Sequence, residues 1–222
     1  MALKLTSADR LALDRRDTDY IIGEAEDALL EENYHEAIEL FRLSAAMGSE
    51  EAYLNLGLCY LYGRGTSENM DLAAAYFKMA ADSDSVEALY NLGKIYCKGS
   101  ENIPKDRGIG LYYYDEAVAQ IHEQGFAAEE FPDLYFNYAK ELMKDDDDFD
   151  TEEAFDYLLT ANEGYSMLVE AGVNTFQEAC DETEELLALP CFDEIKAIYD
   201  EMAEEMDEEK FEKECGCGRH HR

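Results

Sequence analysis

The chain has 222 residues, of which 53 are acidic and 18 basic, so its formal net charge at pH 7 is −35. This charge argues against binding to nucleic acids or anionic membrane surfaces, because both require a basic protein surface. Hydrophobic residues make up 47% of the chain, which is enough for a sizeable core. We expect that the carboxylates either make the outer helix faces hydrophilic, for solubility, or attract a basic partner.

The first residues are polar and charged. Residues 1–16 contain no apolar run of the kind that a secretory signal peptide needs, and no later stretch is long and apolar enough to span a membrane. We therefore expect a cytoplasmic protein whose six cysteines are reduced thiols. Residues 1–18 are expected to form either a leader or a short capping helix, and a first helical hairpin is expected to begin at Asp19 and to turn near Asn33.

A duplicated segment organises the chain. Residues 52–63 and 88–99 share six of twelve residues at an offset of 36: Ala52, Asn55, Leu56, Gly57, Tyr60 and Gly63 recur as Ala88, Asn91, Leu92, Gly93, Tyr96 and Gly99. A period of about 20 to 50 residues is typical of solenoid proteins, in which each repeat packs on the next. Within each copy the apolar residues lie three and four apart, which predicts a helix with one buried face.

Two glycines of each copy have different expected roles. Gly57 and Gly93 lie inside the predicted helices, where glycine costs about 1 kcal/mol relative to alanine. We expect each of them to let a neighbouring helix backbone approach closely. Gly63 and Gly99 are expected to end these helices in the left-handed conformation that glycine adopts freely.

A second helix is expected to follow each of these first helices. Residues 72–81 form it in the first copy, and in the second copy Pro104 to Asp106 open a segment that continues through residues 110–118. Small residues, an aromatic pair and a further small patch keep the same order in both segments. Alternating bulky and small positions allow neighbouring helices to interlock.

These residues carry a family resemblance. The order Ala-x-x-Asn-Leu-Gly-x-x-Tyr-x-x-Gly, followed by a loop, an acidic residue, an alanine and an aromatic pair, resembles the Sel-1-like repeat, a relative of the tetratricopeptide repeat. The resemblance covers residues 48–119. The family usually has an aspartate at the position of Asn69 in the first copy, and the second copy keeps this aspartate as Asp106. It implies an all-α fold, a right-handed α-α superhelix of helical hairpins in which the first helices line a concave surface.

The chain after the duplicated segment predicts a third hairpin and an end cap. Residues 119–132 lengthen the interval, residues 135–139 and 154–158 take the places of the two helices, and Asp150 to Glu153 is a candidate capping box. Residues 173–189 and 191–213 are expected to form two further helices divided by Pro190. We therefore divide the chain into a repeat array at 19–164, capping helices at 165–214 and a tail at 215–222.

The predicted partner-binding residues lie on the first helices. Equivalent asparagines occur once per hairpin, each near a tyrosine that would offer contact area with a polar tip: Asn55, Asn91, Asn137, Tyr53, Tyr90 and Tyr135. In tetratricopeptide relatives, an asparagine at such a position can bind a peptide backbone. The alternative is that the asparagines form local hydrogen bonds between hairpins.

The tail offers a second possible site. Cys215, Cys217, His220 and His221 are ligand types that zinc prefers, but their close spacing favours a flexible tail over a closed tetrahedral site. The run from Asp145 to Asp148 lacks the glycine and glutamate of a calcium-binding hand. The two remaining histidines, at 35 and 122, belong to no pattern of nucleophile and base.

From these observations we predict a non-enzymatic interaction module or scaffold. It is expected to be a monomer without a cofactor that presents a concave helical surface to a protein or peptide, with no nucleic acid or membrane partner. The alternative is a zinc-binding protein in which the helical array merely carries the tail.

Overall fold

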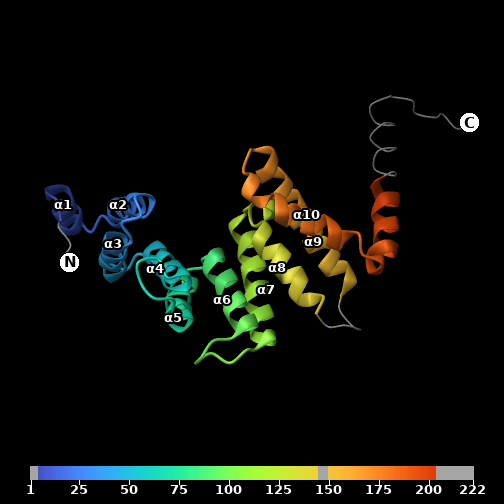
Figure 1. Cartoon of the computed structure of the whole chain (residues 1–222), viewed down its shortest axis with the longest axis horizontal. Helices are drawn as coiled ribbons and strands as arrows, with labels where there is room; N and C mark the ends of the chain where they lie inside the picture. The colour runs from blue at the N-terminus through green and yellow to red at the C-terminus, as the bar shows by residue number, and fades with distance from the viewer. Residues whose placement is uncertain (1–4, 145–149, 204–222) are drawn as a thin grey trace, which may run out of the picture. The chain divides into compact units, whose positions relative to one another are not determined.

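The computed structural model describes residues 5–144 and 150–203, and within these ranges every regular element is helical. The chain forms two compact units, which divide after Phe126. Figure 1 labels and colours the helices in chain order. The predicted all-α class is thus confirmed. The division between the units falls inside the segment 19–164. No helix of the described residues is long and apolar enough to cross a membrane.

The first unit consists of one short helix and three helical hairpins. In chain order its helices are α1 (Ser7–Arg15), α2 (Thr18–Leu30), α3 (Tyr34–Ala46), α4 (Glu50–Tyr62), α5 (Met70–Ala81), α6 (Val86–Lys98) and α7 (Arg107–Gln124). Helix α1 packs on α2, the hairpins are α2/α3, α4/α5 and α6/α7, and α3 contacts α4 as α5 contacts α6. Sequential hairpins that pack in this way form a repeat solenoid.

Side-chain caps begin the helices at repeating positions. Ser49 and Ser85 lie 36 residues apart, and their hydroxyls accept hydrogen bonds from the N–H groups of Ala52 and Ala88, both at 3.3 Å. Asn69 accepts from Leu72 N–H at 2.9 Å in the same way that Asp106 accepts from Ile109 N–H at 3.0 Å. Asparagine therefore fills the capping role of the usual aspartate, because both side chains offer an acceptor oxygen.

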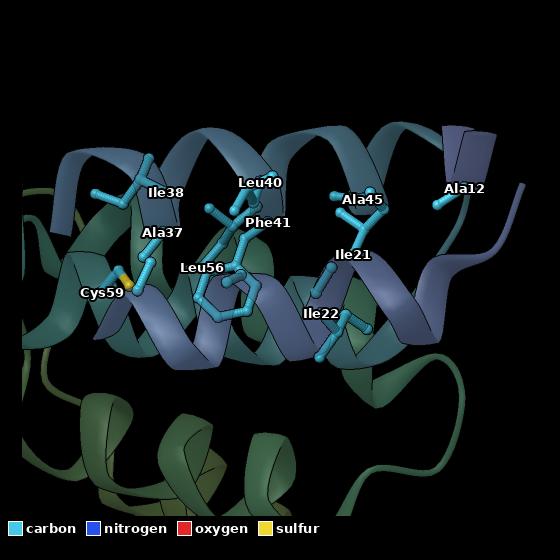
Figure 2. Packing of buried hydrophobic residues seen from close by; sticks show 13 residues of the cluster. Ala12, Ile21, Ile22, Ala37, Ile38, Leu40, Phe41, Ala45, Leu56 and Cys59 are labelled. Carbon is cyan, nitrogen blue, oxygen red and sulfur yellow. The ribbon is translucent and has the colours of Figure 1, made fainter. Parts of the chain in front are cut away.

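The core runs from one hairpin into the next. Figure 2 shows Leu56 of α4 beside Phe41 of α3, and Cys59 of α4 beside Ala37 of α3; Ile21 and Ile22 of α2 belong to the same cluster. A second buried cluster begins at Tyr60 of α4 and extends through Phe77 of α5 to Ile95 of α6. The predicted apolar stripes are thus confirmed, and α4 serves both clusters because its opposite sides face different hairpins.

The glycines inside α4 and α6 make room for aromatic rings. A Cβ atom on Gly57 would lie 2.5 Å from the ring of Phe77, and one on Gly93 would lie 2.4 Å from the ring of Tyr114. Close backbone approach was predicted. The nearest group in both cases is a ring of the second helix of the same hairpin, and at Gly93 the backbone carbonyl oxygen of Gly110 would also lie 3.1 Å from the added Cβ, so the prediction is confirmed for Gly93. A glycine on the first helix paired with an aromatic residue on the second is therefore the repeated unit of hairpin packing.

The two terminal glycines differ. Gly63 ends α4 with φ 66° and ψ 26°, which is the predicted left-handed conformation. Gly99 has φ 77° but ψ 164°, so the prediction of a left-handed end was wrong for α6. The chain after Gly99 turns differently, with Ser100 N–H donating to the carbonyl oxygen of Ile103 at 2.8 Å, and a Cβ on Gly99 would meet the backbone nitrogen of Lys105 at 2.8 Å.

The second unit contains the hairpin that was predicted to follow the duplicated segment, which is the fourth of the chain, and further helices. Its elements are the 3-10 helix η1 (Ala128–Glu130), α8 (Pro132–Leu142), α9 (Thr151–Glu170), η2 (Asn174–Phe176), α10 (Gln177–Leu187) and η3 (Pro190–Phe192), and residues 193–203 are again helical. Helices α8 and α9 pack together as a hairpin, and α10 packs on α9. Pro190 separates α10 from the following helix, as predicted.

Only half of the predicted capping box forms at the start of α9. The Asp150 carboxylate accepts hydrogen bonds from the N–H groups of Glu152 and Glu153, each at 3.1 Å. The Glu153 carboxylate accepts a hydrogen bond from the Tyr157 hydroxyl at 3.0 Å, which is one helical turn further on. The glutamate thus supports a side chain of its own helix.

Candidate functional site

Two of the three asparagines predicted to bind a partner, Asn91 and Asn137, hydrogen-bond within their own helices. Asn91 is 5% exposed, and its Nδ2 donates to the Glu87 carbonyl oxygen at 2.8 Å; Nδ2 of Asn137 donates to the Asp133 carbonyl oxygen at 2.6 Å. Asn55 is partly exposed. A side-chain bond to the carbonyl four residues earlier accounts for an asparagine inside a helix without a ligand. The role of the asparagines as partner contacts therefore stays a prediction. Asn137 belongs to a different unit from Asn55 and Asn91.

The three predicted tyrosines have different environments. Tyr53 is half-buried, and its hydroxyl donates to the Ala45 carbonyl oxygen at 3.0 Å. Tyr90 is partly exposed on α6. Tyr135 is only 3% exposed and lies 5.4 Å from the ring of Tyr157, and burial followed by the charge of Glu129 raises its pKa. We therefore leave Tyr135 out of any surface offered to a partner.

A stripe of partly exposed residues runs along α4 and recurs on α6. Leu54, Leu58 and Tyr62 lie on one side of α4, and the residues 36 positions later on α6 are Tyr90, Lys94 and Lys98. Residues four apart lie one above the other on a helix, so each set forms one row. We call these six residues the α4/α6 face. Only Tyr90 of this set was predicted from the sequence.

A groove lies beside this face, between α4 and α6. It has a volume of about 320 Å³; Leu61, Met70 and Ile95 contribute apolar side chains to it, and Tyr62, Lys94 and Lys98 contribute side chains from the α4/α6 face. Glu68, from the loop between α4 and α5, also lines it. Tyr62 is 51% exposed, so an aromatic ring is available at the groove. An apolar groove bordered by aromatic and charged groups can accept a side chain of a peptide.

Cations at this site lie against aromatic rings. Lys94 Nζ is 4.9 Å from the centre of the Tyr90 ring, and the Arg64 guanidinium is 5.5 Å from the centre of the Tyr62 ring. Contact with a ring face attracts a cation without neutralising its charge. These contacts orient the side chains of Lys94 and Arg64.

The second helices carry a different repeated arrangement. Lys78 Nζ donates to the Tyr96 hydroxyl at 2.9 Å, and the Tyr96 ring stacks on Tyr113 with ring centres 5.4 Å apart. One repeat earlier, Arg42 donates to the Tyr60 hydroxyl at 2.8 Å, and Tyr60 stacks on Tyr76 at 5.6 Å. These contacts join each hairpin to the next, so we assign them to packing. The offset of 36 between Arg42 and Lys78 could have revealed them in the sequence.

The remaining candidate residues from the sequence either lie outside the described ranges or belong to the core. The tail residues Cys215, Cys217, His220 and His221 and the run 145–148 fall outside the described ranges. Among the described residues, no group of three or more His, Cys, Asp or Glu side chains could hold a metal ion. Cys59 and Cys97 are buried, as predicted for core residues, and burial raises the pKa of the Cys59 thiol. A buried thiol with a raised pKa is a poor nucleophile.

The repeat positions agree with a known family. Three consecutive segments match the Sel1 repeat: residues 23–49, 50–85 and 86–122. The second and third segments begin at Glu50 and Val86, the first residues of α4 and α6, so each contains one hairpin of the structure. Residues 23–122 thus consist of three Sel1 repeats. The matched Sel1 repeats all lie in the first unit, and the α8/α9 hairpin lies beyond them.

Two solved structures are similar to this chain, and the first of them shares its fold. A Sel1 repeat protein from Oxalobacter formigenes is 23% identical with a TM-score of 0.56, and the alignment covers 68% of this chain and 59% of that one. A protective antigen of uropathogenic Escherichia coli with an SLR fold is 16% identical with a TM-score of 0.48, covering 96% of this chain and 59% of that chain. This chain thus spans about three fifths of the length of each of these two proteins. No protein of curated function matches the sequence.

Proposed function

We propose that this protein is a non-enzymatic scaffold that binds a protein or peptide through its α4/α6 face. The single observation that carries the proposal is the groove of about 320 Å³ between α4 and α6, with the half-exposed Tyr62 beside it. Tyr62 and Lys98 of this face are exposed, and its other four residues are partly exposed, although Leu54 and Leu58 also pack against a buried cluster of the first unit. Tyrosine is enriched at protein interfaces because it combines contact area with a polar tip.

Its position within the repeat supports the same assignment. The α4/α6 face lies on the first helices of two consecutive repeats, so an extended peptide can contact equivalent positions on both. The hydrogen bonds that join the hairpins involve other residues, namely Arg42, Tyr60, Lys78 and Tyr96. Substitutions on the α4/α6 face are therefore expected to alter binding without unfolding the array.

Two exposed tyrosines provide a matched test. Tyr62 is 51% exposed beside the α4/α6 groove, and Tyr112 is 55% exposed on the second helix α7. The intact chain and its Tyr62→Ala and Tyr112→Ala variants would be used for affinity capture from the source cell, with captured proteins quantified by mass spectrometry. We expect Tyr62→Ala to lower the recovery of the specific partner about tenfold or more, because aromatic anchors carry much of an interface's energy.

The control determines how the result is interpreted. Tyr112→Ala should leave recovery unchanged, and both variants should keep the helical circular dichroism signal and the melting temperature of the original chain. Loss of the partner from Tyr112→Ala with retention by Tyr62→Ala would place binding on the second helices and contradict the proposal.

A further inference from the structure

A second groove lies in the second unit, where α9, α10 and the helix of residues 193–203 meet. Its volume is about 450 Å³, and its apolar lining comes from Phe155, Leu159, Leu187, Tyr199 and Ala203. Phe155 is buried, whereas Leu159 and Leu187 are partly exposed, so apolar side chains are accessible at the groove. A groove with such a lining can accept a large apolar side chain of a partner.

The described part of this unit is strongly acidic, and its lysines are already paired. Residues 127–144 and 150–203 contain 19 acidic and three basic side chains. Each of the three lysines forms an ion pair with a carboxylate, at N–O distances of 2.5 to 3.5 Å: Lys140 with Glu182, Lys144 with Glu141 and Lys196 with Asp193. Most carboxylates of these ranges therefore have no cationic partner within them, and the surface favours a basic partner.

The charge at the groove has the same sign. Of the two charged residues in its described lining, Lys196 is ion-paired, whereas Asp200 forms no ion pair with any described residue. Tyr199 donates a hydrogen bond to the Asp156 carboxylate. This bond, partial burial and the charges of Asp156 and Glu152 raise the pKa of Tyr199 to about 12. Negative charge favours the neutral phenol, so carboxylates act on a side chain that lines the groove.

The charge also distinguishes between the candidate occupants. A symmetric dimer would place the same surface of two copies face to face, and therefore Asp200 and its neighbours against like charges. Residues 204–214, which follow Ala203 in the sequence, contain seven acidic and two basic side chains. Both occupants would bring further negative charge to an acidic groove, whereas a basic segment of another protein would be attracted.

We infer that the groove between α9, α10 and residues 193–203 binds a basic segment of a partner protein. A large apolar side chain of that segment enters over Phe155 and Leu159, and flanking lysine or arginine side chains pair with Asp200 and Glu152. The apolar side chain is the anchor, and the charge pairs speed association and fix the register of the segment. The groove lies in the second unit, so the inference is independent of the α4/α6 face.

The test is a selection from a library of random peptides on the intact chain. The Kd of the selected peptides, each with a fluorescent label, would be measured by fluorescence anisotropy. Peptides that Leu159→Ala loses and Tyr62→Ala retains are assigned to this groove, and we expect lysine or arginine around one large apolar residue in them. Their Kd should rise about tenfold or more in Leu159→Ala, about tenfold in Glu152→Gln/Asp200→Asn, and also with added salt.

Matched variants supply the controls. Met167→Ala removes a 57% exposed apolar side chain from the same helix, outside the groove lining. Asp27→Asn/Glu31→Gln, in the first unit, changes the net charge by the same amount as Glu152→Gln/Asp200→Asn. Both controls should leave the Kd within about twofold, and unchanged melting temperatures would show that the variants fold. Equal weakening by the two charge variants would mean a general effect of net charge and would overturn the inference.

A second apolar variant covers a loss of stability. Leu187→Ala removes the same kind of side chain from α10 and replaces Leu159→Ala in the test if that variant lowers the melting temperature.

The remaining outcomes assign the groove to another occupant or to none. Acidic or uncharged peptides that are lost in Leu159→Ala would overturn the basic ligand class. A dimer seen in sedimentation of the original chain and abolished by Leu159→Ala would assign the groove to a second copy. Tighter peptide binding by Met206→Asp/Phe211→Asp would assign it to the segment that follows Ala203. Each result would contradict the inference, as would a library that yields no peptide lost in Leu159→Ala.

Discussion

The Lys78 ammonium on α5 donates a hydrogen bond to the Tyr96 hydroxyl on α6, 2.9 Å away, and so joins one hairpin to the next. Arg42 and Tyr60 form the same connection one repeat earlier, at 2.8 Å. The corresponding position on α7 is Asp115, whose carboxylate cannot donate such a bond, and the first unit ends shortly after α7. The contact thus occurs at both junctions between the hairpins of the first unit.

We expect the Lys78–Tyr96 contact to stabilise the array modestly. Lys78 is exposed, so the Lys78→Met variant should lower the free energy of unfolding by about 0.5 to 1 kcal/mol, through loss of the hydrogen bond and the cation–ring contact. Methionine keeps the helix propensity of lysine. Urea unfolding of the single variants and of Lys78→Met/Tyr96→Phe would give the coupling between the two residues.

An exposed lysine without this contact provides the control for the cycle. Lys98→Met should change the free energy of unfolding by no more than about 0.5 kcal/mol, as is usual for surface substitutions. Strict additivity of Lys78→Met and Tyr96→Phe would show that the hydrogen bond contributes nothing to stability.

Two helical glycines should respond to alanine in opposite ways. Gly23→Ala on α2 should raise the free energy of unfolding by about 0.5 to 1 kcal/mol, because no atom lies within 4 Å of the added methyl group. Gly93→Ala should lower it by about 1 to 3 kcal/mol, because the methyl group would overlap the buried ring of Tyr114. Thermal and urea unfolding of both variants would measure the difference. Stabilisation by Gly93→Ala would show that the ring moves away at no cost.

The fold of the first unit could be predicted because identical residues recur at identical structural positions. Ser49 and Ser85 begin helices, and Gly57 and Gly93 admit a ring, so a match in the sequence corresponds to a match in structure. Gly99 departed from this rule because the loop after it differs from the loop after Gly63. A helix end depends on the residues that follow, which the repeat does not share here.

The candidate site was harder to predict because it depends on differences between repeats. Lys94 and Lys98 replace Leu58 and Tyr62, so a comparison that looks for identities passes over them. The burial of Tyr135 could not be predicted for a different reason. Helix α8 is buried around much of its circumference, including Leu134, Phe136 and Tyr138, so its place in the repeat register could not show which side faces solvent.

The Tyr199 hydroxyl should make the second unit sensitive to alkali. Its hydrogen bond to the Asp156 carboxylate, with partial burial, raises the pKa of Tyr199 to about 12 from an ordinary value of 10.0. Because the folded state favours the neutral phenol, this contribution to stability is fully present below pH 10 and is lost as the pH rises from about 10 to 12. The original chain should therefore lose more stability than Tyr199→Phe over this interval.

The comparison isolates the hydroxyl, because phenylalanine keeps the ring contact with Phe155, 5.4 Å away. At pH 8 the original chain should be more stable than Tyr199→Phe by about 0.5 kcal/mol, since the bond is partly exposed to solvent. Urea unfolding at pH 8, 10, 11 and 12 would measure the difference. A difference that stays constant up to pH 12 would mean that Tyr199 ionises alike in the folded and unfolded chain.

Phe192 should be the most sensitive position after the α8/α9 hairpin. Its side chain is fully buried, 5.4 Å from the ring of Phe155 on α9, and it holds η3 against the hairpin. Phe192→Ala should lower the free energy of unfolding by about 3 to 5 kcal/mol, because it removes apolar contacts and leaves a cavity. Cys191→Ala changes the exposed neighbour and should cost no more than about 0.5 kcal/mol. Amide hydrogen exchange along α9 would detect the loss, and equal protection in the two variants would mean that residues after Pro190 do not stabilise the hairpin.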